Sequence, residues 1–195
     1  MPRVSSDELV YGDGLAIMSV QWPPDGSEQT ALESMRTLHA AAGDASRVRF
    51  NDAKCDRRGR LVAGTMDLFW MDNFPPTKPA VGALYSVDPL ALGAAANAKG
   101  SAAGSEKEAE TRPEFVNGHL RLVDDRCIYL SNGITWSLDD RLLYFVDSVP
   151  RTISVYDYNV VTGEASVLLC ALISIKYSSH DHTSILVLVV TSKQY

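Results

Sequence analysis

The chain has 195 residues, of which 46% are hydrophobic and 22% are charged, and its net charge is −6. This length is sufficient for one substantial domain with a buried core, and the composition is that of a folded soluble protein rather than a disordered one. The acidic balance gives no support to nucleic-acid binding, which depends on a surplus of Lys and Arg gathered into a patch.

Short strands joined by turns are predicted for the first half of the chain. Residues 8–20 have the pattern of a β-hairpin that turns at residues 12–14. Residues 31–43 combine helical propensity with a Gly43 that could cap a helix, but the same run could also form an edge strand. A second hairpin is expected over residues 48–66, and a further short strand over residues 83–87.

A four-stranded sheet is predicted for the second half of the chain. Its expected strands are rich in β-branched and aromatic residues and lie at residues 127–130, 134–137, 142–146 and 153–158. Between the two halves, residues 91–111 consist mainly of Ala, Gly, Ser, Glu and Lys. Such a segment cannot bury enough apolar surface to offset the entropy cost of ordering it. We therefore expect a flexible surface insertion within an all-β fold.

One pattern in the chain recurs after 81 residues: Asn51, Arg60 and Leu61 return as Asn132, Arg141 and Leu142. An offset of this size accommodates two repeats of about 40 residues, the size of a four-stranded propeller blade. Loops at one end of such blades converge on a central channel, where a ligand can bind. The alternative is chance similarity between two hairpins of a β-sandwich.

The cysteines and the apolar runs bear on the compartment. Cys55, Cys127 and Cys170 are far apart and form no CxxC pair, so neither a disulfide framework nor a zinc or redox motif is indicated. The first residues lack the apolar core of a secretory signal, and we expect a cytoplasmic protein. The apolar runs at residues 167–175 and 185–190 are shorter than the ~20 residues that a membrane-spanning helix needs, so no membrane association is expected.

Two ordered blocks of motifs carry a family resemblance. The first block is Arg49-Phe50-Asn51-Asp52, Gly59-Arg60, Ala63-Gly64-Thr65-Met66 and Leu84-Tyr85-Ser86. The second block is Ser131-Asn132-Gly133-Ile134-Thr135-Trp136-Ser137, Tyr144-Phe145-Val146-Asp147-Ser148, Tyr156-Asp157-Tyr158 and Thr162-Gly163-Glu164. Over roughly residues 47–165, their order and spacing resemble the regucalcin (SMP-30), gluconolactonase and LRE-like family.

The resemblance implies a six-bladed β-propeller that hydrolyses sugar lactones with a divalent metal in its channel. This chain is long enough for about four blades at most, so we expect a partial or truncated member. Its propeller domain would cover residues 1–165, and a divergent apolar tail would cover residues 166–195. Calcium is the metal implied first, and zinc, magnesium or manganese are alternatives. A propeller that lacks blades exposes apolar faces, so self-association through unpaired blade edges is expected.

By the same resemblance, Arg49 and Asn51 would hold the hydroxyl groups of a sugar lactone, and Asn132 would bind the metal. Guanidinium and amide groups suit the first role, and the neutral side-chain oxygen of Asn suits Ca²⁺ or Mg²⁺. An Asn before a Gly is also typical of a turn without function, and Asn51-Asp52 has the same alternative.

The acidic residues that the family uses have no match in this chain. They are a metal-binding Glu near the N-terminus, for which Glu8 and Glu28 are the nearest candidates, and a later Asp that also serves as the general base. The catalytic base is therefore unassigned. Two other functions stay open: an inactive family member that binds calcium weakly, and a propeller-type interaction module.

Overall fold

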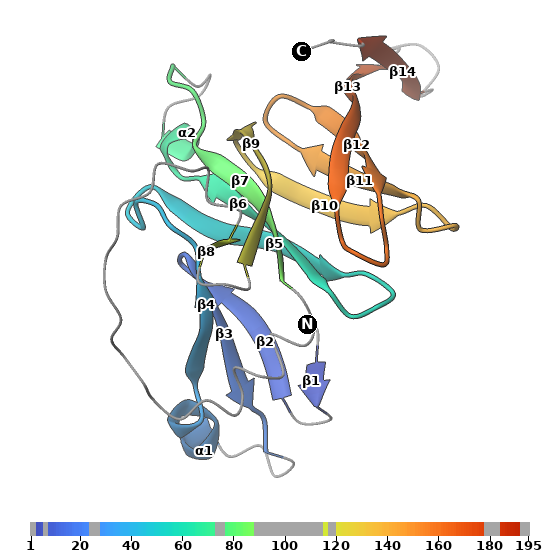
Figure 1. Ribbon diagram of the computed structural model, residues 1–195. Coiled ribbons are helices and arrows are strands. Elements are labelled where there is room, and N and C mark those ends of the chain that lie inside the picture. The colour runs from blue at the N-terminus through green and yellow to red at the C-terminus, as the bar shows by residue number, and fades with distance from the viewer. Residues whose placement is uncertain are drawn as a thin grey trace, which may run out of the picture.

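A computed structural model of the chain describes residues 3–5, 8–23, 28–72, 77–87, 115–116, 120–177 and 184–191. These residues form antiparallel strands in three sheets, with two short helices, α1 (Glu28–Glu33) and α2 (Phe69–Asp72). Figure 1 shows the three sheets following one another along the chain, from the N-terminal sheet through the middle sheet to the C-terminal sheet. The all-β prediction is confirmed.

The first sheet contains the hairpin predicted over residues 8–20. Its strands are, in spatial order, β1 (Arg3–Ser5), β2 (Glu8–Asp13), β3 (Ala16–Gln21) and β4 (Arg36–Ala40). Residues 31–43 begin in α1, which ends at Glu33, and continue as β4 at the sheet edge. Ser34 fixes the end of α1, because its hydroxyl donates to the carbonyl oxygen of Ala31 and accepts the N–H of Gln21. The edge-strand alternative is correct for residues 36–40, and Gly43 caps no helix.

The second sheet contains the predicted hairpin of residues 48–66 and the predicted strand of residues 83–87. Its spatial order is β5 (Val48–Cys55), β6 (Leu61–Asp67), β7 (Gly82–Val87), β9 (Leu120–Ile128) and β8 (Phe115–Val116). Every residue of β6 and β7 is buried, since both faces of this sheet are covered by a neighbouring sheet. The insertion predicted over residues 91–111 lies outside the described residues.

The third sheet differs from the four strands predicted for it. Its spatial order is β10 (Ser131–Trp136), β11 (Leu142–Asp147), β12 (Thr152–Tyr158), β13 (Ala165–Tyr177) and β14 (Ser184–Thr191). The strand predicted over residues 127–130 is wrong, because β9 ends at Ile128 within the second sheet. The strand ends where Cys127 has a φ of 56°, and the Asp147 carboxylate then accepts the N–H groups of Tyr129 and Leu130. These bonds lead the chain from one sheet to the next.

β13 belongs to the third sheet, because it pairs with β12 from Ala165 to Leu172 and with β14 on its other side. The predicted boundary between residues 165 and 166 therefore lies at the start of a strand rather than between two sheets.

The 81-residue offset corresponds to one sheet and not to two repeats of about 40 residues. Asn51 lies on β5 and Asn132 on β10, which are the first strands of consecutive sheets. The repeat is long because residues 88–119, which include β8, separate β7 from β9 in the sequence. The prediction of two short repeats was based on the usual size of a propeller blade, and it is wrong because a single sheet spans the whole offset.

The core consists of two apolar layers, one on each side of the second sheet. Alternate residues of β6 enter different layers: Leu61 and Ala63 belong to the same core cluster as the first sheet's Val10 and Ile17, whereas Val62 belongs to the cluster of the third sheet's Leu143. This alternation follows from the pleat of a strand. Sheets stacked face to face in chain order are the blades of a partial β-propeller. Within the described residues, no helix has the length and apolar character needed to cross a membrane.

Candidate functional site

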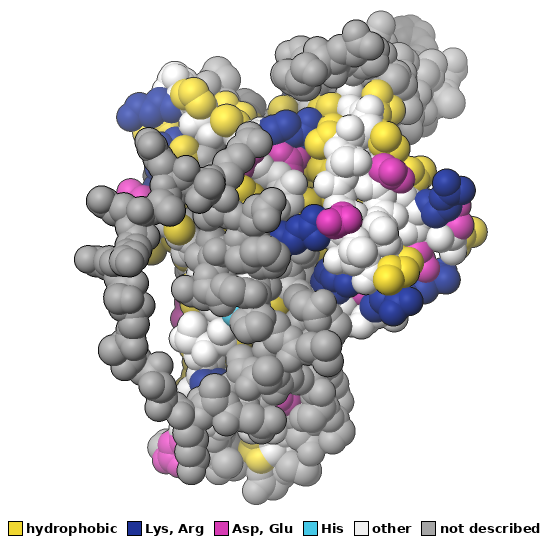
Figure 2. All heavy atoms as spheres, viewed as in Figure 1, with side chains coloured by type: hydrophobic (Ala, Val, Ile, Leu, Met, Phe, Trp, Pro, Cys, Tyr) yellow, Lys and Arg dark blue, Asp and Glu magenta, His cyan; other side chains and the backbone are white. Residues whose placement is uncertain are grey.

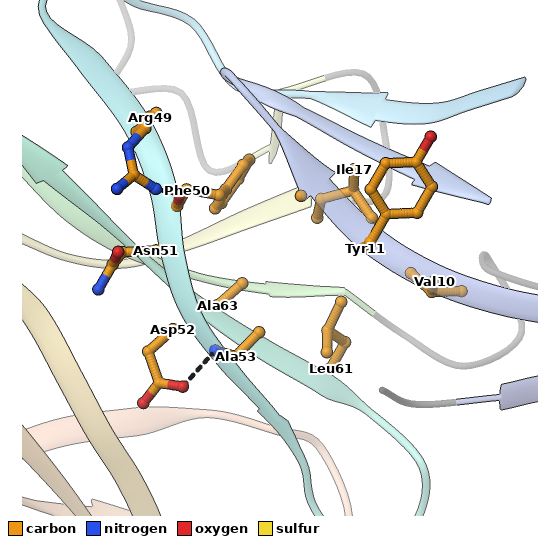
Figure 3. Close-up of a pocket in the computed structure, with 11 residues that line it drawn as sticks. Val10, Tyr11, Ile17, Arg49, Phe50, Asn51, Asp52, Ala53, Leu61 and Ala63 are labelled. Atoms are coloured by element: carbon orange, nitrogen blue, oxygen red, sulfur yellow. Dashed lines mark hydrogen bonds between the residues drawn. The ribbon is translucent and has the colours of Figure 1, made fainter. Parts of the chain in front are cut away.

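Strand β5 carries the residues predicted to bind substrate. It is the edge strand of the second sheet, and it lies next to β2 on one side and β10 on the other. Phe50 points into the core near Ile17, whereas Arg49 and Asn51 are exposed and point to the opposite side of the strand (Figure 3). All three residues Arg49, Asn51 and Asp52 belong to the lining of a cavity of about 140 Å³, together with apolar residues of β2, β3 and β6. Their side chains nevertheless point away from the apolar side of this cavity, where Val10, Tyr11 and Ile17 lie (Figure 3).

Asn51 occupies a β-bulge. Phe50 pairs with Thr65 and Asp52 pairs with Gly64, so Asn51 is an extra residue opposite β6. A bulge redirects the side chains around it. As a result, Asn51 and Asp52 both point away from Ile17 although they are adjacent in sequence (Figure 3).

Asn132 occupies a second bulge, at the equivalent place on β10. Ser131 pairs with Asp147 and Ile134 with Phe145, so three steps along β10 face two along β11. Gly133 has a φ of 88°, which suits glycine, and the side chain of Asn132 is exposed. The turn alternative is wrong for both asparagines, because each lies within a strand.

The two bulges are joined by hydrogen bonds between β5 and β10. Asn51 Nδ2 donates to the carbonyl oxygen of Ser131 at 2.8 Å, and the N–H of Gly133 donates to Asp52 Oδ2 at 2.6 Å. The structure thus brings the candidate substrate contact Asn51 to the residue that precedes the candidate metal ligand Asn132. The guanidinium of Arg49 donates to the carbonyl oxygen of Phe50 at 3.1 Å and remains on the same face of β5.

Sequence reasoning assigned no role to Asp52, because an Asn-Asp pair is typical of a turn. A signal was nevertheless present: Asp52 and Gly133 are 81 residues apart, the offset at which the pattern recurs. The same offset separates Lys54 from Thr135, which are bonded between the two strands, and Arg57 from Leu138, which are bonded between the turns that follow them.

Gly64 allows β10 to approach β6. Ser131 is fully buried, and a Cβ placed on Gly64 would lie only 1.9 Å from Ser131 Oγ. The Ala63-Gly64-Thr65-Met66 motif therefore supports the position of the Ser131-Asn132-Gly133 motif by providing space for its serine.

The acidic residues nearest to these motifs are engaged in internal contacts. Glu8 is buried and paired with Arg36 on β4. Asp67 is buried and accepts from Arg47 at 2.9 Å. Burial raises the pKa of the Asp147 carboxyl, although the N–H groups of Tyr129 and Leu130 partly oppose this. The side chain of Glu28 lies outside the described residues.

The donors around Asn132 fit a divalent cation in kind but not in number. Amide and carboxylate oxygens are suitable ligands, but Ca²⁺ takes six to eight of them. No group of three or more His, Cys, Asp or Glu residues that could hold a metal ion occurs in the described part of the chain. The described residues alone therefore do not complete a metal site.

Comparison with known proteins connects this site to one family. The family model described as the SMP-30/gluconolactonase/LRE-like region matches residues 5–170. Regucalcin of Pongo abelii is 29% identical over 166 residues, which are 83% of this chain and 41% of the relative. Regucalcin of Danio rerio is 32% identical over 130 residues, which are 67% of this chain and 33% of the relative.

Two solved structures share the fold. A luciferin-regenerating enzyme has a TM-score of 0.59 at 21% identity, over 95% of this chain and 59% of its own. A calcium-binding protein, regucalcin, from Agrobacterium tumefaciens has a TM-score of 0.54 at 18% identity, over 85% of this chain and 43% of its own. The chain thus spans less than two thirds of each of these relatives.

Proposed function

Because the chain belongs to the SMP-30/gluconolactonase/LRE-like family, we propose that it is a sugar-lactone hydrolase of the gluconolactonase type. The observation that supports this function is that the Arg49-Phe50-Asn51-Asp52 motif of β5 is hydrogen-bonded to the Ser131-Asn132-Gly133 motif of β10. Arg49, Asn51 and Asn132 are exposed on these neighbouring strands, and two hydrogen bonds join the strands at the bulges. Polar side chains held in this way are suited to orienting a polyhydroxylated ring.

Arg49 and Asn51 have different roles in binding the substrate. The guanidinium of Arg49 carries only donors, so it binds a carbonyl or hydroxyl oxygen of the lactone. The Asn51 Nδ2 group already donates to Ser131, so its Oδ1 accepts from a sugar hydroxyl. A substrate with both a carbonyl oxygen and free hydroxyls, as in an aldonolactone, matches this pair.

The reaction is the addition of water to the lactone carbonyl, followed by cleavage of the ring C–O bond to give the open hydroxy acid. The residues of this site bind and orient the substrate for that step. Both oxygens of Asp52 accept backbone N–H groups, from Ala53 and Gly133, so we assign this residue to holding the two strands together rather than to proton transfer. No other described residue of the site is assigned as the base.

We further propose that Asn132 contributes one neutral oxygen ligand to a divalent cation, calcium before zinc, magnesium or manganese. The shortage of carboxylates favours a second candidate function, a family member that binds calcium weakly without turnover. Both candidates place the cation at the β10 bulge. They differ in whether a lactone is opened.

A third proposal concerns partners. Hydrophobic side chains gather on the visible face of the third sheet where β12 and β13 lie (Figure 2). Leu168 is 58% exposed, and Leu138 and Val161, in the turns of this sheet, are 92% and 63% exposed. Exposed apolar groups of this kind support self-association or an interaction module. Light scattering during size-exclusion chromatography tests this proposal, and a compact monomer counts against it.

We also propose a cytoplasmic location, which fractionation of cells that express the tagged chain would test.

Hydrolysis of gluconolactone by the purified chain tests the main proposal. Acid release is measured with calcium, zinc, magnesium or manganese, and calcium binding is measured in parallel by calorimetry. We expect Arg49→Gln to lower kcat/KM by about tenfold or more, because a hydrogen bond to a charged group is lost. The matched control for Arg49→Gln is Arg58→Gln, because Arg58 is an exposed arginine in the β5–β6 turn. Asn132→Ala should weaken calcium binding. Calcium binding without turnover under all four metals would support the second candidate function.

A further inference from the structure

Strand β5 determines the backbone conformation of Asn132. The peptide group before Asn132 carries the carbonyl oxygen of Ser131, which accepts from Asn51 Nδ2. The peptide group after Asn132 carries the N–H of Gly133, which donates to Asp52 Oδ2. Both peptide planes next to Asn132 are therefore anchored to one neighbouring strand. Since these planes define the backbone angles of Asn132, they also define the direction of its Cα–Cβ bond, from which the side chain extends.

The bond from Gly133 to Asp52 has a particular physical reason. A bulge interrupts the hydrogen bonds between β10 and β11, so a residue within it lacks a partner on the adjacent strand. Asp52 supplies the acceptor from a different sheet. At 2.6 Å the bond to its carboxylate is short, as charge-assisted hydrogen bonds are. Its other oxygen accepts the N–H of Ala53 at 2.9 Å, which holds the carboxylate on β5 (Figure 3).

We propose that Asp52 is a positioning residue, which sets the direction of the Asn132 side chain by accepting the N–H of Gly133. The proposal rests on the proposed function insofar as Asn132 is a ligand. It also changes the reading of the Arg49-Phe50-Asn51-Asp52 motif. In this assignment Arg49 binds the substrate, and Asn51 binds the substrate and also donates to β10. Asp52 accepts a hydrogen bond from β10.

Three variants of the full chain test this role. Asp52→Ala removes the acceptor, whereas Asp52→Asn keeps an oxygen that can accept the N–H of Gly133 while removing the charge. Asp44→Ala is the matched control, because Asp44 likewise accepts a local N–H, from Ser46 at 2.9 Å, but is bonded to no residue of β10. Amide hydrogen exchange at Gly133, followed by NMR, reports the bond directly. Calorimetric titration with calcium chloride reports its consequence for Asn132.

We expect Gly133 exchange to accelerate by about tenfold or more in Asp52→Ala, as the loss of a hydrogen bond to a charged group predicts, and to stay unchanged in Asp44→Ala. Calcium affinity should fall in Asp52→Ala and recover in Asp52→Asn. If Asp52→Ala does not fold, the comparison of Asp52→Asn with the unmodified chain decides, since retained Gly133 protection and calcium affinity are expected there.

Two results would overturn the positioning role. One is unchanged Gly133 exchange in Asp52→Ala. The other is a calcium affinity in Asp52→Asn as low as in Asp52→Ala with Gly133 protected, because the charge and not the hydrogen bond would then matter. If the unmodified chain binds neither calcium nor lactone, the proposed function fails, and Gly133 exchange still decides whether Asp52 holds the bulge.

Discussion

Substituting Gly64 by alanine tests whether close packing of β6 against β10 holds the site together. The added Cβ would lie 1.9 Å from Ser131 Oγ and 2.5 Å from Ser131 Cβ. Ser131 Oγ must recede by about 1.5 Å to reach ordinary contact, and it has no free space because Ser131 is fully buried. Overpacking of this kind costs about 1–3 kcal/mol, and losing the bond from Asn51 to Ser131 adds about 1 kcal/mol. We expect Gly64→Ala to lower the free energy of unfolding by about 2–4 kcal/mol.

Urea unfolding followed by circular dichroism measures this loss. Ser131→Gly removes both clashing atoms, so the Gly64→Ala/Ser131→Gly double variant should be more stable than the sum of the two single effects predicts. Gly14→Ala is a control for backbone strain alone, because Gly14 has a φ of 54° and no atom lies within 4 Å of an added Cβ. A Gly64→Ala chain within about 0.5 kcal/mol of the original, or the absence of coupling to Ser131, would refute the reasoning.

Other predictions concern the buried polar groups between the second and third sheets. Arg60→Met leaves the Asp56 carboxylate buried without its counter-charge and should destabilise the chain by about 3–5 kcal/mol in urea unfolding; a loss under about 1 kcal/mol would contradict this. Burial and the hydrogen bond to Asp56 raise the pKa of Tyr158 to about 12, so stability should fall as the pH rises from 10 towards 12. Absorbance titration should show this phase, and Tyr158→Phe should lack it. Burial acts to raise the pKa of Asp124, but hydrogen bonds from Arg126 and Tyr156 outweigh it and lower the pKa below 3.8. Stability should therefore fall as the pH drops through that lowered value, and Asp124→Asn should flatten the acid limb of the stability profile.

Much of the fold could be predicted from local patterns. The hairpins of residues 8–20 and 48–66 were recognised because turn residues separate strand-forming runs, and β11 and β12 were recognised by their β-branched and aromatic residues. Assignment of strands to sheets was less successful. The strand ending at Ile128 belongs to the second sheet because it pairs with β7, where Gly82 lies opposite Ile128 although the two are far apart in the sequence. A contact at that distance leaves no local pattern.

The candidate site could be predicted only in part. Arg49, Asn51 and Asn132 were found through family motifs, and the structure places them on two neighbouring strands. The bulges that present Asn51 and Asn132 depend on register between strands, which single-sequence reasoning does not determine. Asp52 was missed for the same reason, because its partner Gly133 is close only after two sheets have packed.

The family motifs of this chain act as joints between sheets as much as they supply chemistry. Arg60 of the second sheet bonds the carbonyl oxygens of Val160 and Val161 in the third, and a Cβ on Gly163 would lie 2.3 Å from Arg60 Nε. The Gly59-Arg60 motif therefore fits against the Thr162-Gly163-Glu164 motif, just as Gly64 fits against Ser131. The contacts of Arg60 with Gly163 and of Gly64 with Ser131 stabilise the packing of the two sheets, and they do so whether or not the protein hydrolyses a lactone. A chain can thus keep the motifs and the blade geometry of its family while its acidic residues serve other contacts, as Glu8 does with Arg36. Activity must consequently be judged from the donors around Asn132, and not from the number of motifs that match.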